Sequence, residues 1–462
     1  MVFSVDHPHN ESVFSPRFLI GFFGIPRPIR TVGSFGRVGC VSCLVIFGFL
    51  PIAHAAPSPL TYRHLHHLFT VPVYEMRAWV GEEEVWTFRG HAIMPPQELR
   101  AEGDTVPPLP TGYERTLRAS WNRTAIEETL RRRIADHFDQ EPGSVSIDRT
   151  ASGAIVFEGV GFPGRAVDLA AASLLTVAAL ESGATDIILP VIETQPAVIV
   201  RDPALRAQGI RALVTVGESN FAGSTLNRVH NISVGLRRFN GHLIAPGETF
   251  SFVETLGRVD ASTGYRKELT IIGERTVPDY GGGLCQVSST AYRGVWEYGF
   301  PIIRRKNHSY AVSYYAPQGT DATVYPPYVD MQFSNDSPGA LLIQTHMDPE
   351  THRAYFLYYG TRDNRTAHVA GPYTWNHKSP PPPRTEQTTQ IAPGTQRKVG
   401  EAVPGMDVAW FRILRKDGKE NIEGTYSVYQ ARPLFWQIGV ASLTSGTGSL
   451  TDAPAGEEML SD

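Results

Sequence analysis

Apolar side chains recur at three- and four-residue steps in several segments of the chain, which predicts helices with one buried face. Thr124 and Glu127 form a capping box that would begin one such helix. Its apolar positions recur every four residues, at Ile126, Leu130, Ile134 and Phe138. A second helix is predicted from its N-cap, Asp168, to Gly183.

Short runs rich in β-branched and aromatic residues predict strands. Apolar strands are expected over residues 187–192 and 197–200, and a hairpin over residues 408–429 would turn at residues 416–419. Residues 304–314 alternate, so that His308, Tyr310, Val312 and Tyr314 would share one face of a strand. We therefore expect an α+β fold with a mixed α/β N-terminal domain, a strand-rich α+β central domain and a small antiparallel β region at the C-terminus.

A third helix is predicted after Gly281-Gly282-Gly283. Its apolar positions recur at helical steps until Gly299 ends the run, at Leu284, Val287, Ala291, Val295 and Tyr298. Cys285 would therefore lie at the N-terminus of this helix. There the helix dipole and the free N–H groups favour a thiolate and lower the pKa of a nucleophile.

The composition of the chain is that of an ordinary globular protein. Lys and Arg number 42 against 46 Asp and Glu, a formal charge of −4 without a sustained basic block, so nucleic acid is not expected as a partner. The generous numbers of glycines and prolines, 43 and 35, favour a strand-rich, turn-rich fold over a helical bundle.

The N-terminal segment has the order of features found in a secretory signal. An apolar run from Val38 to Ile52 follows several arginines and ends in Ala53-His54-Ala55, a pattern that signal peptidase recognises. We expect an exported protein, which touches a membrane only if this segment stays uncleaved. The segment before Arg30 fits a signal poorly, so translation is expected to start downstream of Met1.

Cleavage after residue 55 would remove two of the three cysteines and leave Cys285 alone. A single thiol in an oxidising compartment is either buried or used. His64, His66 and His67 follow the cleavage site, but no carboxylate stands at ligand spacing nearby, so we expect an exposed segment without a metal. No cofactor is expected.

Cys285 has neighbours suited to nucleophilic catalysis. The N–H groups around Gly281, Gly282, Gly283 and Gln286 could hold the oxyanion that forms when a thiolate attacks an amide carbonyl. A phosphate-binding loop is the weaker reading, because no Lys-Ser/Thr follows the glycines.

A cysteine nucleophile needs a base and a group that orients the base. The strand predicted over residues 304–314 could return His308 to Cys285, although a histidine with a purely structural role fits the same pattern. Asp321 is the first choice for orienting the imidazole, with Asn307 and Asp279 behind it, although Asp321 could equally form a turn.

A group of polar residues upstream lies off the apolar stripe of its own predicted helix: Asn227, Arg228, His230 and Asn231. Such residues line a substrate groove or form the solvated face of the helix, and the second case is commoner.

These segments resemble the VanW family. The motifs occur in order over about 100 residues, at 219–223, 227–232, 246–252, 281–286, 307–310 and 321–324. The resemblance adds Glu248, Asn307, Ser309 and Tyr310 to the expected substrate groove. It implies attack by Cys285 on a peptidoglycan stem-peptide carbonyl and release of the acyl group by an amine, as in an L,D-transpeptidase. Familiar L,D-transpeptidases place the histidine first, whereas His308 follows Cys285 here, so the chemistry could be shared without the fold.

The expected organisation follows from these features. We expect a leader and signal peptide over residues 1–55, an α+β domain over 69–204, the VanW domain over 205–379, a Pro-rich linker over 380–391, a small β region over 392–441 and a disordered tail over 442–462. The resemblance implies that the domain over 69–204 binds peptidoglycan and that the protein lies in the cell envelope, periplasmic or extracellular and wall-associated. The oligomeric state is not predicted. Two other functions remain open, a cell-wall cysteine peptidase or amidase with the same residues and a non-catalytic peptidoglycan-binding scaffold protein.

Overall fold

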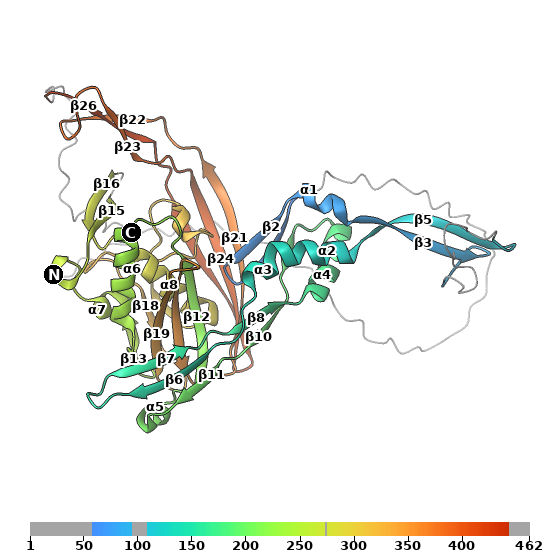
Figure 1. Cartoon of the computed structure of the whole chain (residues 1–462), viewed down its shortest axis with the longest axis horizontal. Helices are drawn as coiled ribbons and strands as arrows, with labels where there is room; N and C mark the ends of the chain where they lie inside the picture. Colours follow the sequence, from blue (N-terminus) through green and yellow to red (C-terminus); the bar gives the residue numbers. More distant parts are fainter. Residues whose placement is uncertain (1–57, 95–108, 273–274, 443–462) are drawn as a thin grey trace, which may run out of the picture. The chain divides into compact units, whose positions relative to one another are not determined.

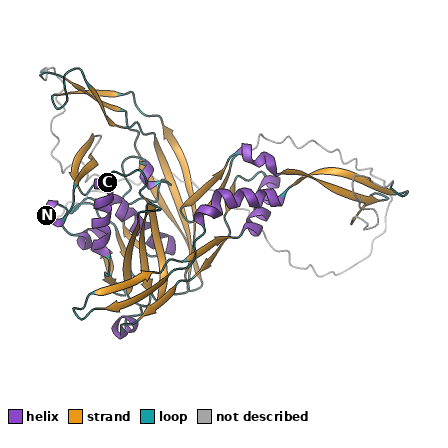
Figure 2. Ribbon diagram, in the orientation of Figure 1, coloured by secondary structure: helices purple, strands orange, loops and turns teal. Residues whose placement is uncertain are grey.

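The computed structural model describes residues 58–94, 109–272 and 275–442, and the side chains of residues 271–276 are outside the description. The expected signal peptide and nearly all of the expected tail fall outside these ranges. The described residues form an α+β fold in which strands predominate (Figures 1 and 2). None of the described helices has the length and apolar character needed to cross a membrane.

The N-terminal part of the described chain combines short helices with several small sheets. One apolar core joins its first hairpin to helices α2 and α4 and contains Tyr62, Trp79, Ile126 and Leu130. The strands are β1 (Leu60–His64), β2 (His67–Val71), β3 (Val80–Phe88), β4 (His91–Ile93), β5 (Tyr113–Trp121), β6 (Ser144–Arg149), β7 (Ile155–Val160), β8 (Gly164–Val167), β9 (Asp186–Ile188), β10 (Val191–Thr194) and β11 (Ala197–Val200). The helices are α1 (Val73–Met76), α2 (Arg123–Leu130), α3 (Asp136–Phe138), α4 (Leu169–Ser182) and α5 (Pro203–Ala207).

These elements confirm one helix boundary and correct two other predictions. Helix α4 has Asp168 as its N-cap and Gly183 as its C-cap, as predicted. Helix α2 has its N-cap at Asn122, two residues before the predicted Thr124, and the side chain of Asn122 accepts the amide of Ala125. The apolar run 187–192 is divided between β9 and β10, which pair with β1 and β8. Pro190 lies between them and cannot donate a ladder hydrogen bond.

The central part is built on the sheet β12-β20-β19-β13. Its buried residues face two cores, one shared with helices α6 and α8 and one shared with β6, β7 and β11. The strands of this region are β12 (Ala212–Asn220), β13 (Leu243–Ile244), β14 (Thr249–Ser251), β15 (Lys267–Ile272), β16 (Arg275–Tyr280), β17 (Ile302–Arg304), β18 (Gln332–Ser334), β19 (Leu341–Asp348) and β20 (Arg353–Gly360). The helices are α6 (Leu226–Phe239), α7 (Phe252–Leu256) and α8 (Leu284–Tyr298).

Helix α8 lies unusually close to strand β12, and two glycines make this approach possible. A Cβ atom on Gly217 would meet the carbonyl oxygen of Thr290 at 1.9 Å, and one on Gly294 would meet the amide nitrogen of Gly217 at 2.6 Å. Ser219 and Thr290 add a buried hydrogen bond of 2.6 Å between the two elements. Any larger side chain at either glycine would therefore displace the helix that carries Cys285.

The C-terminal part contains the sheets β21-β24-β25 and β22-β26-β23. The hairpin of β24 and β25 turns between Lys416 and Lys419, as predicted. The region is not purely antiparallel, because β22 runs parallel to β26. Strand β22 also lies within the stretch expected to be a linker. The strands are β21 (Thr366–Lys378), β22 (Arg384–Thr388), β23 (Gln396–Gly400), β24 (Gly405–Lys416), β25 (Lys419–Tyr429) and β26 (Phe435–Gly439).

The predicted strand over residues 304–314 is wrong. Strand β17 ends at Arg304, and the chain then continues as an irregular loop up to a 3₁₀ turn over Ser313–Tyr315. The backbone groups of this loop bond to distant segments, since Lys306 accepts the amide of Thr323 and Ser309 accepts the amide of Gln430. His308 therefore belongs to a loop that long-range contacts hold in place.

Candidate active site

Cys285 is the second residue of helix α8, whose N-cap is Gly283. The φ angle of Gly283 is 113°, a left-handed conformation that favours glycine. The thiol is half-buried, and its Sγ atom lies 3.5 Å from both the hydroxyl of Thr323 and the carbonyl oxygen of Val324. The helix N-terminus predicted for this residue is thus present, with the segment around residue 323 lying against it.

His308 and Asp321 form a tight pair. The ring Nδ1 atom of His308 lies 2.6 Å from Oδ2 of Asp321, and the backbone N–H of His308 donates to the same oxygen at 2.7 Å. Because Asp321 accepts at Nδ1, the ring carries its proton there and directs Nε2 away from the carboxylate. Tyr315 stacks on the other side of the imidazole, with ring centroids 4.1 Å apart.

The charges of Cys285 and His308 act on each other. Burial alone would raise the pKa of the Cys285 thiol, but the neighbouring ring of His308 lowers it to about 7. Burial would lower the pKa of His308, but the hydrogen bond with Asp321 and the neighbouring Cys285 thiol raise it to about 9. Nε2 of His308 is buried and has no hydrogen-bond partner among the described residues, so the Cys285 thiol and the ring act on each other's pKa without an aligned hydrogen bond.

Asp321 is fully buried, and side chains from other segments of the chain donate hydrogen bonds to its carboxylate. Its Oδ1 atom accepts from the hydroxyl of Tyr429 at 2.5 Å and from Arg305 at 3.2 Å. The Tyr429 hydroxyl in turn accepts the amide of Gly319 at 2.8 Å. Tyr429 comes from strand β25, so the C-terminal hairpin contributes directly to this carboxylate.

The sequence did not point to Tyr429, Arg305 or Tyr315 as residues of the candidate site. These three residues can be recognised as part of the site only once the fold is known. Tyr315 and Tyr429 are buried there, and Arg305 has the carboxylate of Asp321 as its partner. A weak signal existed for Ser289, which follows Cys285 by one helical turn. Its hydroxyl donates to the carbonyl of Cys285 at 2.8 Å and accepts the amide of Ala322 at 3.0 Å. Ser289 thus ties the Asp321 segment to the helix that carries the thiol.

The other two candidates for orienting the imidazole are engaged elsewhere. The Asp279 carboxylate accepts the amide of Tyr280 in its own strand. The side chain of Asn307 donates to the carbonyl oxygens of His308 and Val428. Of the three candidates, only Asp321 contacts the ring.

The glycine loop narrows the choice of oxyanion donors. The amides of Leu284 and Gln286 donate to the carbonyls of Gly281 and Gly283. The Gln286 side chain is fully buried and donates to Ser219, so this residue cannot supply a donor as expected. Gly282 packs against Glu268, and a Cβ there would meet its side chain at 2.9 Å. Among the backbone hydrogen bonds of this turn in the described residues, the amide of Cys285 has no acceptor, so it is the candidate oxyanion donor.

The polar residues of helix α6 mostly hold the neighbouring chain rather than line a groove. The fully buried Asn231 donates to the carbonyls of Arg266 and Gly282 and accepts the amide of Arg266, which excludes it from an open groove. His230 contacts the carbonyl of Gly264 at 2.9 Å, and the exposed Asn227 donates to the carbonyl of Lys267. Arg228 differs from these three, because its charged end lies over the ring of Tyr314.

The residues that the resemblance added to the groove have varied surroundings. Glu248 is exposed and closes a turn by accepting the amide of Ala245. Ser309 is exposed and bonded through its carbonyl to the amide of Gln430. Tyr310 is buried under Arg432, whose guanidinium carbon lies 5.5 Å from the ring centroid. Asn307 contacts the catalytic candidates by donating to the His308 carbonyl.

The histidines expected in an exposed segment are instead packed into the protein. His66 contacts Glu297 of helix α8 at 2.7 Å, and His67 contacts Glu218 of strand β12 at 3.0 Å. His66, His67 and Glu218 bring ligand atoms within 4.8 Å of one another. Burial lowers the pKa of His67 to about 4, which keeps its ring neutral as a metal requires.

Two guanidinium groups nevertheless occupy the carboxylate of this cluster. Arg353 and Arg165 donate to Glu218 at 3.0 and 3.3 Å. A cation bound there would face both arginines at close range in a buried environment, which strongly disfavours it. We read the cluster as an internal network in which two arginines pair with Glu218, and His66 and His67 connect the β1–β2 hairpin to α8 and the central sheet.

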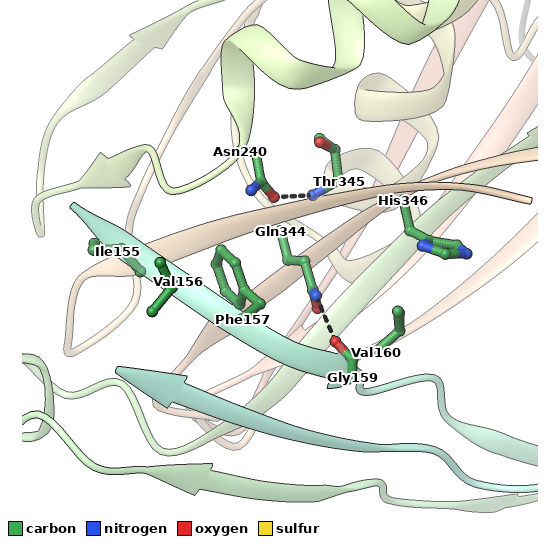
Figure 3. A pocket seen from close by; sticks show the side chains of 9 residues that line it. All are labelled: Ile155, Val156, Phe157, Gly159, Val160, Asn240, Gln344, Thr345 and His346. Atoms are coloured by element: carbon green, nitrogen blue, oxygen red, sulfur yellow. Dashed lines mark hydrogen bonds between the residues drawn. The ribbon is translucent and has the colours of Figure 1, made fainter. Parts of the chain in front are cut away.

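A separate hollow of about 440 Å³ lies between β7 and β19 (Figure 3). Gln344 donates across it to the carbonyl of Gly159, and Asn240 accepts the amide of Thr345 at its rim. The lining carries no cysteine, serine or carboxylate. The thiol, imidazole and carboxylate described above therefore remain the candidate for chemistry.

Comparison with known proteins places this site within a family. A family model described as VanW like protein matches residues 227–357. The uncharacterised protein YoaR of Bacillus subtilis is 36% identical over 124 residues, which make up 27% of this chain and 41% of that protein. The vancomycin B-type resistance protein VanW of Enterococcus faecalis is 31% identical over 129 residues, 27% of this chain and 46% of that protein.

The chain thus spans less than half the length of these two curated relatives. The matched range includes Cys285, His308 and Asp321, whereas Tyr429 lies beyond it. The motifs quoted from the sequence and the match to the family model agree, and the chain carries a domain of the VanW family over residues 227–357.

Proposed function

We propose that this protein is an exported cysteine acyltransferase that acts on peptidoglycan stem peptides. One observation carries the proposal: the half-buried thiol of Cys285 stands at a helix N-terminus, and an imidazole that Asp321 orients lowers its pKa. A cysteine with a lowered pKa, a histidine and a buried carboxylate form the set that nucleophilic acyl transfer requires. The family likeness supports the peptidoglycan substrate in this proposal, and the signal-like N-terminal sequence supports the export.

In the first step, the Cys285 thiolate attacks the carbonyl carbon of a peptide bond and forms a C–S bond. The amide N–H of Cys285 stabilises the oxyanion. The C–N bond then breaks, and the His308 imidazolium gives its proton to the leaving amine. The product of this step is a thioester on Cys285.

In the second step, an amine of a neighbouring stem peptide attacks the thioester. His308 takes the proton from this amine, the new C–N bond forms, and the C–S bond breaks to restore the thiolate. Asp321 stabilises the imidazolium in both steps, because its carboxylate is held by Tyr429 and Arg305.

Product analysis tests this function. Purified protein incubated with disaccharide-tetrapeptides is expected to give cross-linked dimers, and Cys285→Ala protein should give none. Trimmed monomers without dimers would assign the same residues to a hydrolase, with water in place of the acceptor amine. Unchanged substrate, together with binding to sacculi that Cys285→Ala leaves intact, would support a non-catalytic scaffold protein instead.

A further inference from the structure

Arg228 is a buried cation without a carboxylate partner in the candidate active site. It belongs to helix α6, and 7% of its surface is exposed. Its guanidinium donates to the hydroxyl of Ser224 at 2.6 Å and lies 4.0 Å from the ring centroid of Tyr314. Among the described residues, no aspartate or glutamate forms an ion pair with it. A buried charge of this kind is costly unless something else compensates it.

Other buried arginines of the chain are compensated much more fully. Arg365 pairs with Asp363 and Asp336, and Arg412 pairs with Glu423 and donates to two main-chain carbonyls. Arg293 donates to the carbonyls of four residues: Glu218, Tyr315, Ala316 and Thr320. Arg228 has two hydroxyl partners, Ser224 and Tyr315, and one aromatic face, but no carboxylate and no carbonyl among the described residues. The difference indicates a missing anion.

Two contacts place Arg228 beside the reacting groups. Its Cγ atom would lie 3.2 Å from a Cβ built on Gly283, the N-cap of the helix that carries Cys285. Burial and the charge of Cys285 raise the pKa of the Tyr315 hydroxyl, and the guanidinium of Arg228 opposes them. Tyr315 also stacks on His308, so the tyrosine that bonds Arg228 contacts the catalytic imidazole.

We propose that Arg228 binds a carboxylate of the acyl donor, so that the enzyme attacks a peptide carbonyl with a free carboxylate close by. This inference rests on the proposed function and adds the class of donor. A guanidinium can hold a carboxylate through two parallel hydrogen bonds, which fixes the orientation of the peptide. The carboxylate belongs either to the C-terminus of the donor or to the side chain of a stem residue.

Matched donors distinguish these two sources. The rate of Cys285 acylation is measured by intact-protein mass spectrometry with a disaccharide-tetrapeptide, its C-terminal carboxamide and its side-chain carboxamide. The carboxamide that removes the bound carboxylate is expected to react about 10- to 100-fold more slowly, as for other hydrogen bonds to charged groups. The slow derivative identifies which carboxylate Arg228 binds.

Variants link that preference to Arg228. In Arg228→Gln, the ratio of acid to carboxamide rates should fall close to one, whereas Arg228→Lys should keep part of it. Arg237→Gln is the control, because Arg237 lies exposed on the same helix and also donates to a serine four residues earlier, Ser233. A ratio of two rates is unaffected by a loss of folded protein, because both donors meet the same sample.

The outcomes separate this inference from the proposed function. Equal rates for all three donors in the unmodified protein would overturn the role of Arg228 and leave acyl transfer intact. If no donor acylates the protein, calorimetric Kd values for the same peptides on Cys285→Ala protein test Arg228 alone. Tighter binding of the acid that Arg228→Gln abolishes would uphold the carboxylate site, and equal binding would overturn it.

Discussion

His308 donates two hydrogen bonds to a single oxygen of Asp321, one from its ring at 2.6 Å and one from its backbone amide at 2.7 Å. The two bonds fix both the position of the loop and the orientation of the imidazole. A rotation of the ring would break the first bond while the second still held the carboxylate. The geometry thus holds Nε2 as the ring atom available to the thiol and to a leaving amine.

The pH dependence of acyl transfer should be bell-shaped. The pKa of Cys285 is lowered to about 7, so the thiolate is lost as the pH falls through that value. The pKa of His308 is raised to about 9, so the imidazolium is lost as the pH rises through that value. The ion pair is therefore the main form between the two. We expect kcat/KM to fall on both sides of this window, and a profile that rises steadily above pH 9 would contradict the pair.

Replacing His308 should remove the activation of the thiol. In His308→Ala, burial remains while the compensating charge is lost, so the pKa of Cys285 should rise to or above its ordinary value of about 8.5. Alkylation by iodoacetamide at pH 6 to 7 should then slow about tenfold or more. His230→Ala is the control, because His230 contacts the carbonyl of Gly264 instead. Equal slowing in both variants would show that folding, and not the pair, sets reactivity.

Asp321→Asn should reduce both stability and activity. The carboxylate is buried among Arg305, His308 and Tyr429, and removing one partner of a buried charged network costs about 3 to 5 kcal/mol. Burial raises the pKa of Asp321, but hydrogen bonds and charge from His308 hold it well below its usual range. The Asp321 carboxylate therefore stabilises the fold at any pH above its pKa in the unfolded chain. This stabilisation is lost as the pH falls through its lower pKa in the folded protein.

Urea unfolding and the pH profile measure these two effects. The upper limb of the pH–activity profile should move to lower pH in Asp321→Asn, because the His308 imidazolium loses its counter-charge. Asp279→Asn serves as the comparison, since Asp279 bonds only the neighbouring amide in its strand. A profile unchanged in Asp321→Asn would mean that this carboxylate does not act on His308.

Tyr429→Phe tests the contribution of the C-terminal hairpin. Loss of the hydroxyl leaves the Gly319 amide unpaired and removes one donor from Asp321, which should cost about 1 to 3 kcal/mol. Tyr426→Phe is the matched control, because Tyr426 lies on the same strand and is 63% exposed. The upper limb of the pH profile should move to slightly higher pH in Tyr429→Phe. A carboxylate with one fewer hydrogen-bond donor holds the proton of the His308 imidazolium more strongly. An unfolding free energy equal to that of Tyr426→Phe would contradict this role.

The local features of the site could be predicted from sequence because they depend on nearby residues. The apolar positions after Gly283 and the glycine at residue 299 predicted helix α8, and the helix has those bounds. Cys285 was accordingly placed at its N-terminus. The pairing of His308 with Asp321 also spans only 13 residues, so both fall within one motif series.

The long-range features could not be predicted in the same way. His308 was expected on a strand, but its loop takes its hydrogen bonds from segments around Thr323 and Gln430. Tyr429 is 108 residues from Asp321, and no local pattern connects them. His66 and His67 were expected to be exposed, because Glu218 and Glu297 lie too far along the chain to suggest a contact.

Mass spectrometry of the protein quenched during reaction tests the central claim most directly. Incubation with a disaccharide-tetrapeptide at pH 8 should add the mass of one acyl group, and digestion should place it on the peptide that contains Cys285. Hydroxylamine should remove this group, because thioesters are cleaved by it, and Cys285→Ala protein should carry none. An unmodified Cys285 during active turnover, or an adduct that persists in Cys285→Ala, would contradict the account.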